Sequence, residues 1–252
     1  MQSEPDVAIV TGGAGGIGEA AVRAIARRGA RVALADLRPA AAEEAAARLQ
    51  AEALDVEPVS VDVGSEGSVR VMVETLLARW GRIDILVNNA GVESSKPFLE
   101  IGVEEYEQVM RVNVTGAWLC CQAVIPTMLR QGRGCIVNVS SVAGQRGGGL
   151  LGTAAYSTSK GAVIALTKAL AREFAKSGIR VNAVSPSLTM TDFAQRQLER
   201  LAAGTLERVI AMTPIGRVAQ AVEIAAAIDF LTSDQASFVA GHVLNVDGGT
   251  AM

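Results

Sequence analysis

The stretch TGGAGGIG, residues 11–18, carries five glycines in eight positions between the apolar run VAIV and a helical pattern. A glycine loop between a first strand and a first helix gathers backbone N–H groups and the positive end of the helix at one point, which suits a pyrophosphate. A tight structural turn would show the same glycines, so the context has to decide. Two registers fit the loop: Gly13, Gly15 and Gly18 as G-x-G-x-x-G, or Gly12, Gly16 and Gly18 as T-G-x-x-x-G-x-G.

Short β-branched runs alternate with alanine-rich or periodic stretches along the whole chain. The expected strands cover residues 7–10, 31–35, 59–62, 83–88, 135–140, 180–185 and 242–246, and the expected helices cover 16–28, 39–53, 65–80, 104–131, 154–176 and 221–231. This alternation predicts βαβ crossovers and a parallel sheet with helices on both faces. We therefore predict an α/β fold, a Rossmann-type doubly wound parallel sheet of about seven strands, in a single domain over 1–252.

Two segments interrupt this alternation. Residues 145–152, QRGGGLLG, are expected to form a flexible loop, and residues 190–212 an extra, partly helical excursion. Both follow the C-terminal ends of strands, where open α/β sheets bind ligands. We expect a substrate loop or lid over about 187–214 on the same grounds.

The composition excludes several classes of protein. A net charge of −3 and a pI near 5.4 give no electrostatic case for nucleic acid or an anionic membrane. The N-terminus lacks the basic and apolar regions of a signal peptide, and no apolar run reaches the roughly 18 residues that span a bilayer. Cys120, Cys121 and Cys135 are expected to be buried apolar filler, and no His/Cys/acid spacing suggests a metal. We expect a soluble, cytoplasmic protein with reduced thiols, no metal, and no nucleic-acid or membrane partner.

An acidic residue follows the second expected strand. Asp36 stands eighteen residues past Gly18, where a carboxylate accepts hydrogen bonds from a ribose diol and repels a 2′-phosphate. Leu37, not a lysine or arginine, comes next, and the nearby Arg38 is expected to be a solvated residue at a helix start. The sequence therefore predicts NAD(H) as the cofactor in preference to NADP(H).

Further motifs follow in order: Asp62-Val63, NNAG at 88–91, Asn113 in RVNVTG, SSVAG at 140–144, YSTSK at 156–160 and SPSLTMTD at 185–192. Together with the glycine loop and Asp36, this ordered set resembles the short-chain dehydrogenase/reductase family over essentially the whole chain. The resemblance selects the register of Gly12, Gly16 and Gly18, and it leaves Gly13 and Gly15 as permissive positions. Gly15 also stands where NADP-preferring members often carry a basic residue.

The resemblance implies a set of cofactor-binding residues: Gly12, Gly15, Gly16, Ile17, Gly18, Asp36, Leu37, Asp62, Val63, Asn89, Ala90, Gly91, Tyr156, Lys160, Pro186, Thr189 and Thr191. By this resemblance, Asp62 and Val63 meet the adenine, Asn89 to Gly91 line the adenosine ribose, and the two threonines bind the nicotinamide carboxamide. The NNAG segment also suits a strand-ending turn, and both roles can hold together. Ser187 departs from the glycine usual in the family. Because serine disfavours positive φ, the geometry of the turn at this position is left open by the sequence.

The expected chemistry centres on Tyr156 and Lys160. They are four residues apart at a helix start and therefore share a face, although an isolated YxxxK would more often be a surface pair. An alcohol dehydrogenase needs a base near neutral pH, and lowering the ordinary tyrosine pKa by about three units requires roughly 4 kcal/mol. One ammonium about 4 Å away supplies roughly that at an effective dielectric constant of 20. We therefore expect Lys160 to lower the pKa of Tyr156, with the positive ring of NAD⁺ adding to the effect.

Two more residues complete the expected catalytic set of Asn113, Ser141, Tyr156 and Lys160. Ser141 would donate a hydrogen bond to the substrate oxygen; Ser140 is the alternative, which the family pattern disfavours. Asn113 stands within a long expected helix, where asparagine is a poor helix former. The resemblance implies a kink there, with a bound water that relays protons to Lys160; a solvent-facing asparagine is the alternative.

The sequence predicts an NAD(H)-dependent oxidoreductase that interconverts a secondary alcohol and a ketone, with Tyr156 as general acid/base. The alternatives are an NADPH-dependent 3-oxoacyl-thioester reductase, which Asp36 disfavours, and an inactive NAD-binding regulatory protein, which the complete catalytic set disfavours. By resemblance the chain forms a homotetramer or homodimer through the helices at 104–131 and 154–176. The substrate stays open among polyols, hydroxy acids, cyclic alcohols and steroids. The expected mouth residues are Glu93, Ser94, Ser95, 147–151, Leu188, Met190 and Phe193.

Overall fold

Seven parallel strands organise the computed structural model, which describes residues 4–148, 153–199 and 202–252. Their order in the sheet is β3-β2-β1-β4-β5-β6-β9. The strands are β1 Val7–Thr11, β2 Arg31–Asp36, β3 Val56–Ser60, β4 Ile85–Asn88, β5 Gly134–Val139, β6 Ile179–Pro186 and β9 Val243–Val246. This is the doubly wound, Rossmann-type α/β sheet that the alternation of segments predicted.

The chain reverses direction across the sheet between β1 and β4. It runs outward from β1 to β3, then returns to β4 on the other side of β1 and continues to β9. The two loops that leave β1 and β4 therefore diverge and open a crevice at the C-terminal ends of these strands. The glycine loop follows β1 and the NNAG segment ends β4, so the fold brings both motifs to this crevice.

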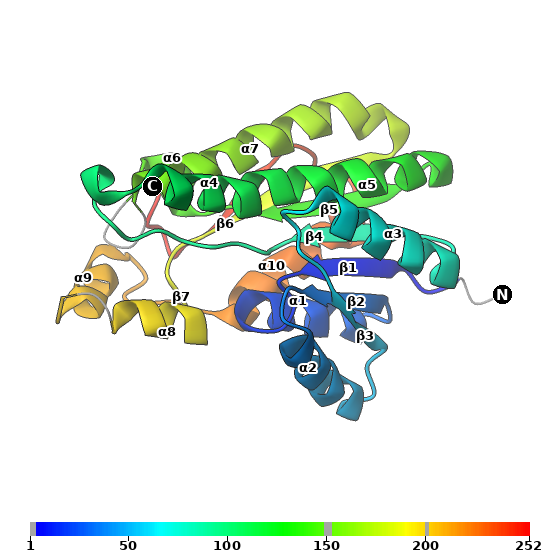
Figure 1. Cartoon of the computed structure of the whole chain (residues 1–252), viewed down its shortest axis with the longest axis horizontal. Helices are drawn as coiled ribbons and strands as arrows, with labels where there is room; N and C mark the ends of the chain where they lie inside the picture. The colour runs from blue at the N-terminus through cyan, green and yellow to red at the C-terminus, as the bar shows by residue number, and fades with distance from the viewer. Residues whose placement is uncertain (1–3, 149–152, 200–201) are drawn as a thin grey trace.

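Two helical layers cover the sheet (Figure 1). On one face lie α1 Gly16–Arg27, α2 Pro39–Ala51 and α10 Ala221–Thr232, and on the other α3 Glu66–Trp80, α5 Gly116–Gln131 and α7 Ala154–Phe174. Alternate residues of β1 supply the two cores: Ala8 and Val10 pack into one, Val7 and Ile9 into the other. Because a strand points successive side chains to opposite faces, a sheet covered twice needs apolar residues throughout its strands.

One long helical rod departs from the expected single helix. It consists of α4 Val103–Met110, the π-helical turn η2 Arg111–Thr115, and α5. Over Val103–Gln131 it is long and apolar enough, by length and composition, to cross a membrane. The sequence analysis looked for uninterrupted apolar runs, none of which reaches about 18 residues, so it did not single out this rod. Half of the apolar window is buried inside the fold, where α5 packs against α3, so the core accounts for its hydropathy.

The third strand was misplaced by the sequence analysis. It was expected at 59–62 but is Val56–Ser60, where Pro58 pairs opposite Leu34 of β2. Proline usually argues against a strand, yet an edge strand tolerates it because one side needs no ladder hydrogen bond. β3 is the edge of this sheet, so the proline does not disrupt the pairing.

The excursion after β6 is partly helical, as predicted. It contains β7 Thr189–Met190, which pairs with β8 Ala219–Gln220, and the helices α8 Asp192–Leu198 and α9 Thr205–Met212. The loop expected at 145–152 begins inside the short helix α6 Val142–Arg146, and its residues 149–152 lie outside the described residues. Single 3₁₀ turns lie at η1 Phe98–Glu100, η3 Ala175–Ser177 and η4 Asp234–Ala236.

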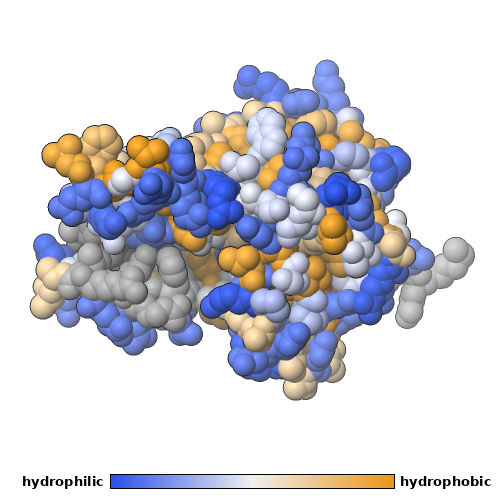
Figure 2. Space-filling view, viewed as in Figure 1, coloured by the Kyte–Doolittle hydropathy of each residue, from blue (hydrophilic) through white to orange (hydrophobic). Residues whose placement is uncertain are grey.

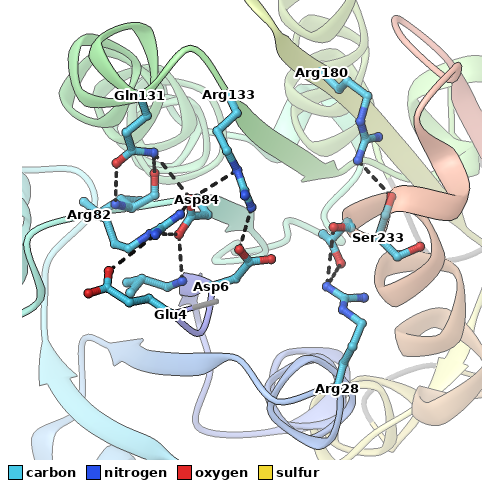
Figure 3. A network of polar contacts seen from close by, with 12 residues as sticks. Glu4, Asp6, Arg28, Arg82, Asp84, Gln131, Arg133, Arg180 and Ser233 are labelled. Carbon is cyan, nitrogen blue, oxygen red and sulfur yellow. Dashed lines mark hydrogen bonds and ion pairs between the residues drawn. The ribbon is translucent and has the colours of Figure 1, made fainter. Parts of the chain in front are cut away.

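A polar network lies at the end of the sheet where the parallel strands begin, called here its N-terminal edge (Figure 3). The buried carboxylate of Asp84 accepts hydrogen bonds from the Val7 backbone N–H at 2.9 Å and from Nε and Nη2 of Arg82 at 2.8 Å each. Nε of Arg133 lies 3.5 Å from the same carboxylate. Asp84 thus ties β1, β4 and the turn before β5 together at one point.

Candidate active site

A cleft of about 670 Å³ lies at the opposite edge, beyond the C-terminal ends of β1, β4, β5 and β6. In Figure 1 this edge faces α8 and α9. The cleft is lined by every residue of the predicted cofactor-binding set except Gly18, and by three of the four predicted catalytic residues. The fourth, Asn113, lies beneath it beside a small cavity. The fold therefore brings segments more than 170 residues apart to one site, as the motifs predicted.

The glycine loop requires glycine at the three positions of the T-G-x-x-x-G-x-G register. Gly12 and Gly16 have positive φ, +63° and +56°, and a Cβ on Gly18 would lie 2.0 Å from the carbonyl oxygen of Gly12. Gly15 is open, since a Cβ there would meet nothing within 4 Å. Gly13 is not a permissive position, because its Cβ would lie 2.9 Å from Leu34 Cγ. That prediction was wrong: it considered the loop alone, whereas β2 packs against it.

Thr11 and Asn89 join the two walls of the crevice. Thr11 Oγ1 accepts hydrogen bonds from the backbone N–H groups of Asn89 and Ala90, each at 3.1 Å. Asn89 Nδ2 donates in return to the carbonyls of Thr11 and Gly12, each at 3.0 Å. The NNAG segment is thus both a turn and a wall of the cleft. The sequence analysis missed Thr11; the signal was a hydroxyl residue between the buried strand and the first loop glycine.

Asp36 is held in place at the end of β2. Its Oδ2 accepts from the Ala14 N–H at 3.2 Å, and its Oδ1 accepts from the N–H and the Nε of Arg38 at 3.1 and 3.3 Å. The carboxylate is buried, while the Arg38 side chain is 66% exposed at the start of α2. The result is an oriented acid that lines the cleft beside the N-terminus of α1. A nicotinamide dinucleotide fits this donor set, with α1 for the pyrophosphate and Asp36 for a ribose diol.

Ser187 does not disturb the turn after β6. Among the described residues, Ala53 is the only non-glycine residue with positive φ, so the backbone at 187 does not require glycine. The carbonyl of Ser187 accepts a hydrogen bond from Thr189 Oγ1 at 3.1 Å, and both residues line the cleft. The question about the turn geometry assumed a left-handed conformation at this position, which the structure does not show.

Two helices place Ser141 beside Tyr156. Ser141 caps α6, and its Oγ accepts from the Ala143 N–H at 3.2 Å, while Tyr156 lies in the first turn of α7. The helices approach closely at Gly144, where a Cβ would lie 2.6 Å from the backbone of Lys160. Ser140, by contrast, is buried and donates to the Lys160 carbonyl at 2.9 Å. Ser141 therefore presents its hydroxyl to the cleft beside Tyr156, whereas the Ser140 hydroxyl is bonded to the Lys160 carbonyl.

Lys160 is buried beneath the tyrosine. Its Nζ donates to the Val139 carbonyl at 2.8 Å and lies 5.7 Å from the centre of the Tyr156 ring. Burial lowers the pKa of Lys160 to about 8, against the opposing effect of the Glu93 carboxylate. Because its pKa is lowered, Lys160 releases its proton at a lower pH than an exposed lysine does.

The expectation that Lys160 lowers the pKa of Tyr156 was wrong for the chain by itself. Burial raises the pKa of Tyr156 above its ordinary value, and the negative charge of Glu93 raises it further. The hydrogen bond with Ser141 acts in the opposite direction. The desolvation of a phenolate outweighs its stabilisation by groups of the chain. An ionised Tyr156 at neutral pH therefore needs positive charge from a bound group.

Asn113 occupies the π-helical turn and is buried, so the solvent-facing alternative was wrong. Its Oδ1 accepts from the Val92 N–H and its Nδ2 donates to the Val92 carbonyl, both at 2.8 Å. Nδ2 also donates to Ser159 Oγ at 2.9 Å. A cavity of about 10 Å³, the room of one water molecule, lies between this turn and Lys160. The kink is thus present, and it leaves water-sized space next to the lysine.

The mouth of the cleft agrees only in part with the sequence. Glu93 and Leu188 line it, with Gly148 from the predicted loop. Ser94 is buried and its Oγ donates to Glu105 at 2.7 Å, and neither Ser95 nor Met190 lines the cleft. The side chain of Phe193 and residues 149–152 lie outside the described part of the chain. The structure adds Val209 and Met212 of α9, whose spacing on one helical face was the available signal.

The three cysteines lie away from the cleft. All are buried free thiols, and burial raises the pKa of Cys121 to about 12 and that of Cys135 to about 11. Within the ranges that the structure describes, no group of three His, Cys, Asp or Glu side chains could hold a metal ion. The thiols are therefore part of the core.

Comparison with known proteins agrees with this site. A protein-family profile described as enoyl-(acyl carrier protein) reductase matches residues 12–251. The chain is 40% identical over 243 residues to cyclopentanol dehydrogenase of Comamonas sp., covering 96% of both proteins. It is 39% identical over 243 residues to D-threitol dehydrogenase of Mycolicibacterium smegmatis, covering 96% of this chain and 92% of that one.

Two further similarities bear on the site. The chain is 36% identical over 249 residues to 3-oxoacyl-[acyl-carrier-protein] reductase FabG of Thermotoga maritima, covering 99% of each protein. The crystal structure of gox2181 superposes with a TM-score of 0.94 at 39% identity, covering 98% of this chain and 96% of that one. With the cleft, the glycine loop and the Ser141–Tyr156–Lys160 cluster in place, the chain belongs to the short-chain dehydrogenase/reductase family of oxidoreductases that act on CH–OH groups.

Proposed function

We propose that this chain is an NAD(H)-dependent dehydrogenase that interconverts a secondary alcohol and a ketone, with Tyr156 as general acid/base. One observation carries the proposal: Ser141, Tyr156 and Lys160 line the same cleft as the glycine loop and Asp36. A cofactor held along that loop would reach from the β2 end of the cleft to the tyrosine.

The side chains divide the work of alcohol oxidation among them. NAD⁺, when bound, supplies the acceptor for the hydride that leaves the carbinol carbon. Ser141 donates a hydrogen bond to the substrate oxygen, and Tyr156 takes the hydroxyl proton, so the C–O bond gains double-bond character as the C–H and O–H bonds break. Lys160 would hold the ribose hydroxyls of the cofactor, and its ammonium would add to the positive charge that the bound cofactor brings to the phenolate. Asn113 holds the π-helical turn that lines the small cavity beside Lys160. A water molecule in this cavity would pass the proton on.

Asp36 supports NAD(H) over NADP(H). An adenosine ribose bound at this end of the cleft would meet the buried carboxylate of Asp36, which would accept from a 2′-hydroxyl and repel a 2′-phosphate. Arg38, the neighbouring cation, is already bonded to the same carboxylate. The open space at Gly15 holds no basic side chain that could bind the extra phosphate.

The relatives' substrates support an alcohol and also raise one rival. Cyclopentanol and D-threitol are alcohols, whereas the relative from Thermotoga maritima reduces a 3-oxoacyl group on a carrier protein. An NADPH-dependent 3-oxoacyl-thioester reductase is therefore the second candidate. Asp36 disfavours it through the cofactor.

A substrate panel tests the proposal directly. The protein would be assayed at 340 nm with secondary alcohols and either NAD⁺ or NADP⁺, and in reverse with ketones and a 3-oxoacyl thioester. We expect turnover of alcohols with a higher kcat/KM for NAD⁺. Turnover confined to the thioester with NADPH would replace this function by the rival, and no turnover with cofactor bound would indicate a regulatory NAD-binding protein.

Assembly into a homodimer or homotetramer is part of the proposal. The outer surface of α4 and α5 exposes Val103, Tyr106, Trp118 and Leu129, and Phe238 and Met252 are exposed near the C-terminus. Figure 2 shows apolar groups on this face of the molecule. Paired α4–α5 and α7 helices would cover the first group. Light scattering of the purified protein measures the number of subunits.

Three further features complete the proposal. Residues 1–252 act as a single dinucleotide-binding and catalytic domain, because the sheet and the cleft use segments from both ends of the chain. Residues 187–214, which carry α8 and α9, form the substrate lid. The buried free thiols suit a reducing, cytoplasmic compartment.

A further inference from the structure

Glu93 lies at the substrate end of the cleft, two residues after the NNAG segment. Its side chain is half-buried and lines the cleft together with Tyr156 and Lys160. The proposed mechanism uses those two residues and Ser141, and gives Glu93 no part. A carboxylate beside the reacting position needs its own account, because a charge there acts on every substrate that binds.

The backbone on both sides of Glu93 is fixed. On one side Asn113 bonds both the N–H and the carbonyl of Val92 at 2.8 Å. On the other side the Ser94 carbonyl accepts from Thr153 Oγ1 at 2.7 Å, and Thr153 caps α7 three residues before Tyr156. Glu93 is therefore held in register with the catalytic helix.

A second set of contacts strengthens this anchor. Ser94 Oγ donates to Glu105 Oε1 at 2.7 Å, and Lys96 Nζ lies 2.6 Å from Glu105 Oε2. These two donors lower the pKa of Glu105, so it stays ionised and keeps accepting from Ser94. Four side chains, Asn113, Thr153, Glu105 and Lys96, thus fix the short segment that carries Glu93. A segment between secondary-structure elements usually has fewer anchoring contacts than this.

The charge of Glu93 reaches the reacting groups. Glu93 lines the cleft together with both residues, and its negative charge helps to raise the pKa of Tyr156 and opposes the lowering of the pKa of Lys160. Lys160, Arg146 and Asp192 also line this part of the cleft, and Arg146 bonds the Thr250 carbonyl at 2.8 Å. Glu93 therefore supplies a carboxylate that can accept hydrogen bonds at the substrate end, beside the Lys160 ammonium.

We propose that Glu93 is a specificity-determining residue that accepts a hydrogen bond from a second hydroxyl group of the substrate, and so selects diols and polyols. The inference rests on the proposed alcohol dehydrogenase function and narrows it. The same carboxylate disfavours substrates that carry an anionic group near the carbinol, such as hydroxy acids. Simple secondary alcohols bind without using it.

The size of the effect follows from the hydrogen bond. A bond to a charged partner in a desolvated site is stronger than one between neutral groups, and it discriminates by roughly 10- to 100-fold. A site built to bond a hydroxyl group also binds the analogue that lacks this group less well.

Four substrates on one carbon frame test this proposal: 2-butanol, 2,3-butanediol, 1,3-butanediol and 3-hydroxybutanoate. Each has a secondary carbinol next to a methyl group, and they differ in the group that would reach Glu93. We would measure kcat/KM with NAD⁺ for the wild type, for Glu93→Gln and for the control Glu104→Gln. Glu104 is exposed on α4 outside the cleft, so the control removes the same charge without touching the site.

In the wild type we expect the better diol to exceed 2-butanol by at least about 10-fold and 3-hydroxybutanoate to be the poorest substrate. Glu93→Gln should lower the ratio of diol to 2-butanol by at least about 10-fold and improve 3-hydroxybutanoate, while Glu104→Gln leaves all ratios unchanged. Unfolding temperatures within a few degrees of the wild type would show that Glu93→Gln folds.

Three results would overturn the inference. Equal use of diols and 2-butanol by the wild type would remove the selectivity, and an unchanged ratio in Glu93→Gln would assign it to another residue. In both cases the alcohols are still oxidised, so the proposed function survives. If none of the four alcohols reacts although NADH binds, the alcohol dehydrogenase function fails as well, and the inference fails with it.

Discussion

The two edges of the central sheet use buried carboxylates in opposite ways. At the N-terminal edge, Asp84 is enclosed by the Val7 N–H, Arg82 and Arg133, and its neighbours in Figure 3 bond one another. At the C-terminal edge, Asp36 and Glu93 line a cleft of about 670 Å³. At the N-terminal edge the charged side chains pair with one another and stabilise the fold. At the C-terminal edge they line the cleft, where a ligand can reach them.

The pattern follows from the topology. Parallel strands end together, so loops of the same kind gather at each edge. Short connections enter the strands at the N-terminal edge, where Arg28 pairs with Asp229 and Arg180 bonds the Leu231 carbonyl at 2.8 Å. Longer segments leave the strands at the other edge, and there burial shifts the pKa of both Tyr156 and Lys160. Substitutions at the two edges should therefore separate stability from function.

The largest expected effect is the loss of turnover in Tyr156→Phe. Removing the hydroxyl leaves no acceptor for the alcohol proton, and we expect kcat/KM to fall by about 1,000-fold, equivalent to about 4 kcal/mol. NADH affinity should stay within about threefold, because the ring remains in place. Steady-state assays and fluorescence titration with NADH measure the two quantities.

The only other tyrosine supplies the control for that substitution. Tyr106 is exposed on α4, so Tyr106→Phe should leave kcat/KM unchanged. Full activity in Tyr156→Phe would remove the tyrosine from the mechanism. Loss of NADH binding in the same variant would instead make it a residue that holds the cofactor.

The second effect, about 3 kcal/mol, should appear at the other edge. Asp84→Asn removes the buried partner of the ion pair and leaves the Arg82 guanidinium only the exposed Glu4 carboxylate at 3.6 Å, so the free energy of unfolding should fall by about 3 kcal/mol. The kcat/KM of the folded enzyme should not change. Urea unfolding at pH 7 measures the loss.

A surface ion pair is the matched comparison for Asp84. The pair of Arg31 and Asp55 is open to solvent, with the aspartate 58% exposed, and Asp55→Asn should cost less than about 0.5 kcal/mol. A comparable loss in both variants would show that burial does not distinguish the N-terminal edge. A drop in kcat/KM for Asp84→Asn would show that the two edges are not independent.

Local patterns in the sequence were sufficient for the fold, and the resemblance of the ordered motifs was needed for most residues of the site. The glycine loop alone left two registers open, and an isolated YxxxK would more often be a surface pair, so both depended on motifs elsewhere in the chain. The alternation of strands and helices determined the doubly wound sheet. The misplaced third strand shows the limit, because only its place at the sheet edge makes Pro58 acceptable there.

Features that depend on distant contacts could not be predicted. The packing of Gly13 against Leu34 and the bonds of Thr11 to Asn89 and Ala90 join separate segments of the chain. The π-helical turn at Asn113 exists because Val92 and Ser159 hold its side chain. The pKa of Tyr156 was expected in the wrong direction because the degree of burial has no signature in a motif of five residues.

The third effect, about 2 kcal/mol, is a pH dependence of stability carried by Lys160. Burial lowers the pKa of Lys160 from 10.5 to about 8, so between these values the unfolded chain binds the proton that the folded chain has released. Stability therefore rises with pH from 8 to 10, by up to about 1.4 kcal/mol per pH unit. Above pH 10 the raised pKa of Tyr156 acts in the opposite direction.

Lys160→Met should remove this slope. Urea unfolding at pH 8, 9 and 10 would compare it with Lys168→Met, an exposed lysine on the same helix, which should keep the wild-type slope. Equal slopes in all three proteins would mean that Lys160 remains charged in the fold. In that case Lys160 would behave like Arg82 and Arg133 at the N-terminal edge, which keep their charge in the folded protein.

The smallest expected effect is a change of cofactor preference in Asp36→Asn. Loss of the charge removes the repulsion of a 2′-phosphate and releases the Arg38 guanidinium, whose Nε lies 3.3 Å from Asp36 Oδ1. The ratio of kcat/KM for NADH to that for NADPH should fall by about 10-fold, or about 1.4 kcal/mol. Asp62 lines the same cleft on the expected adenine side. Asp62→Asn should therefore change kcat/KM for NADH and for NADPH by the same factor.

This last variant compares the two edges most closely, because Asp36→Asn and Asp84→Asn make the same chemical change. In Asp36→Asn one side-chain oxygen remains and can still accept from one of the two backbone N–H groups. We therefore expect a smaller loss of stability than for Asp84→Asn, measured by the same urea titration. A loss as large as that of Asp84→Asn, with an unchanged cofactor ratio, would make Asp36 a structural acid. A shifted ratio with little loss of stability would make it a recognition group.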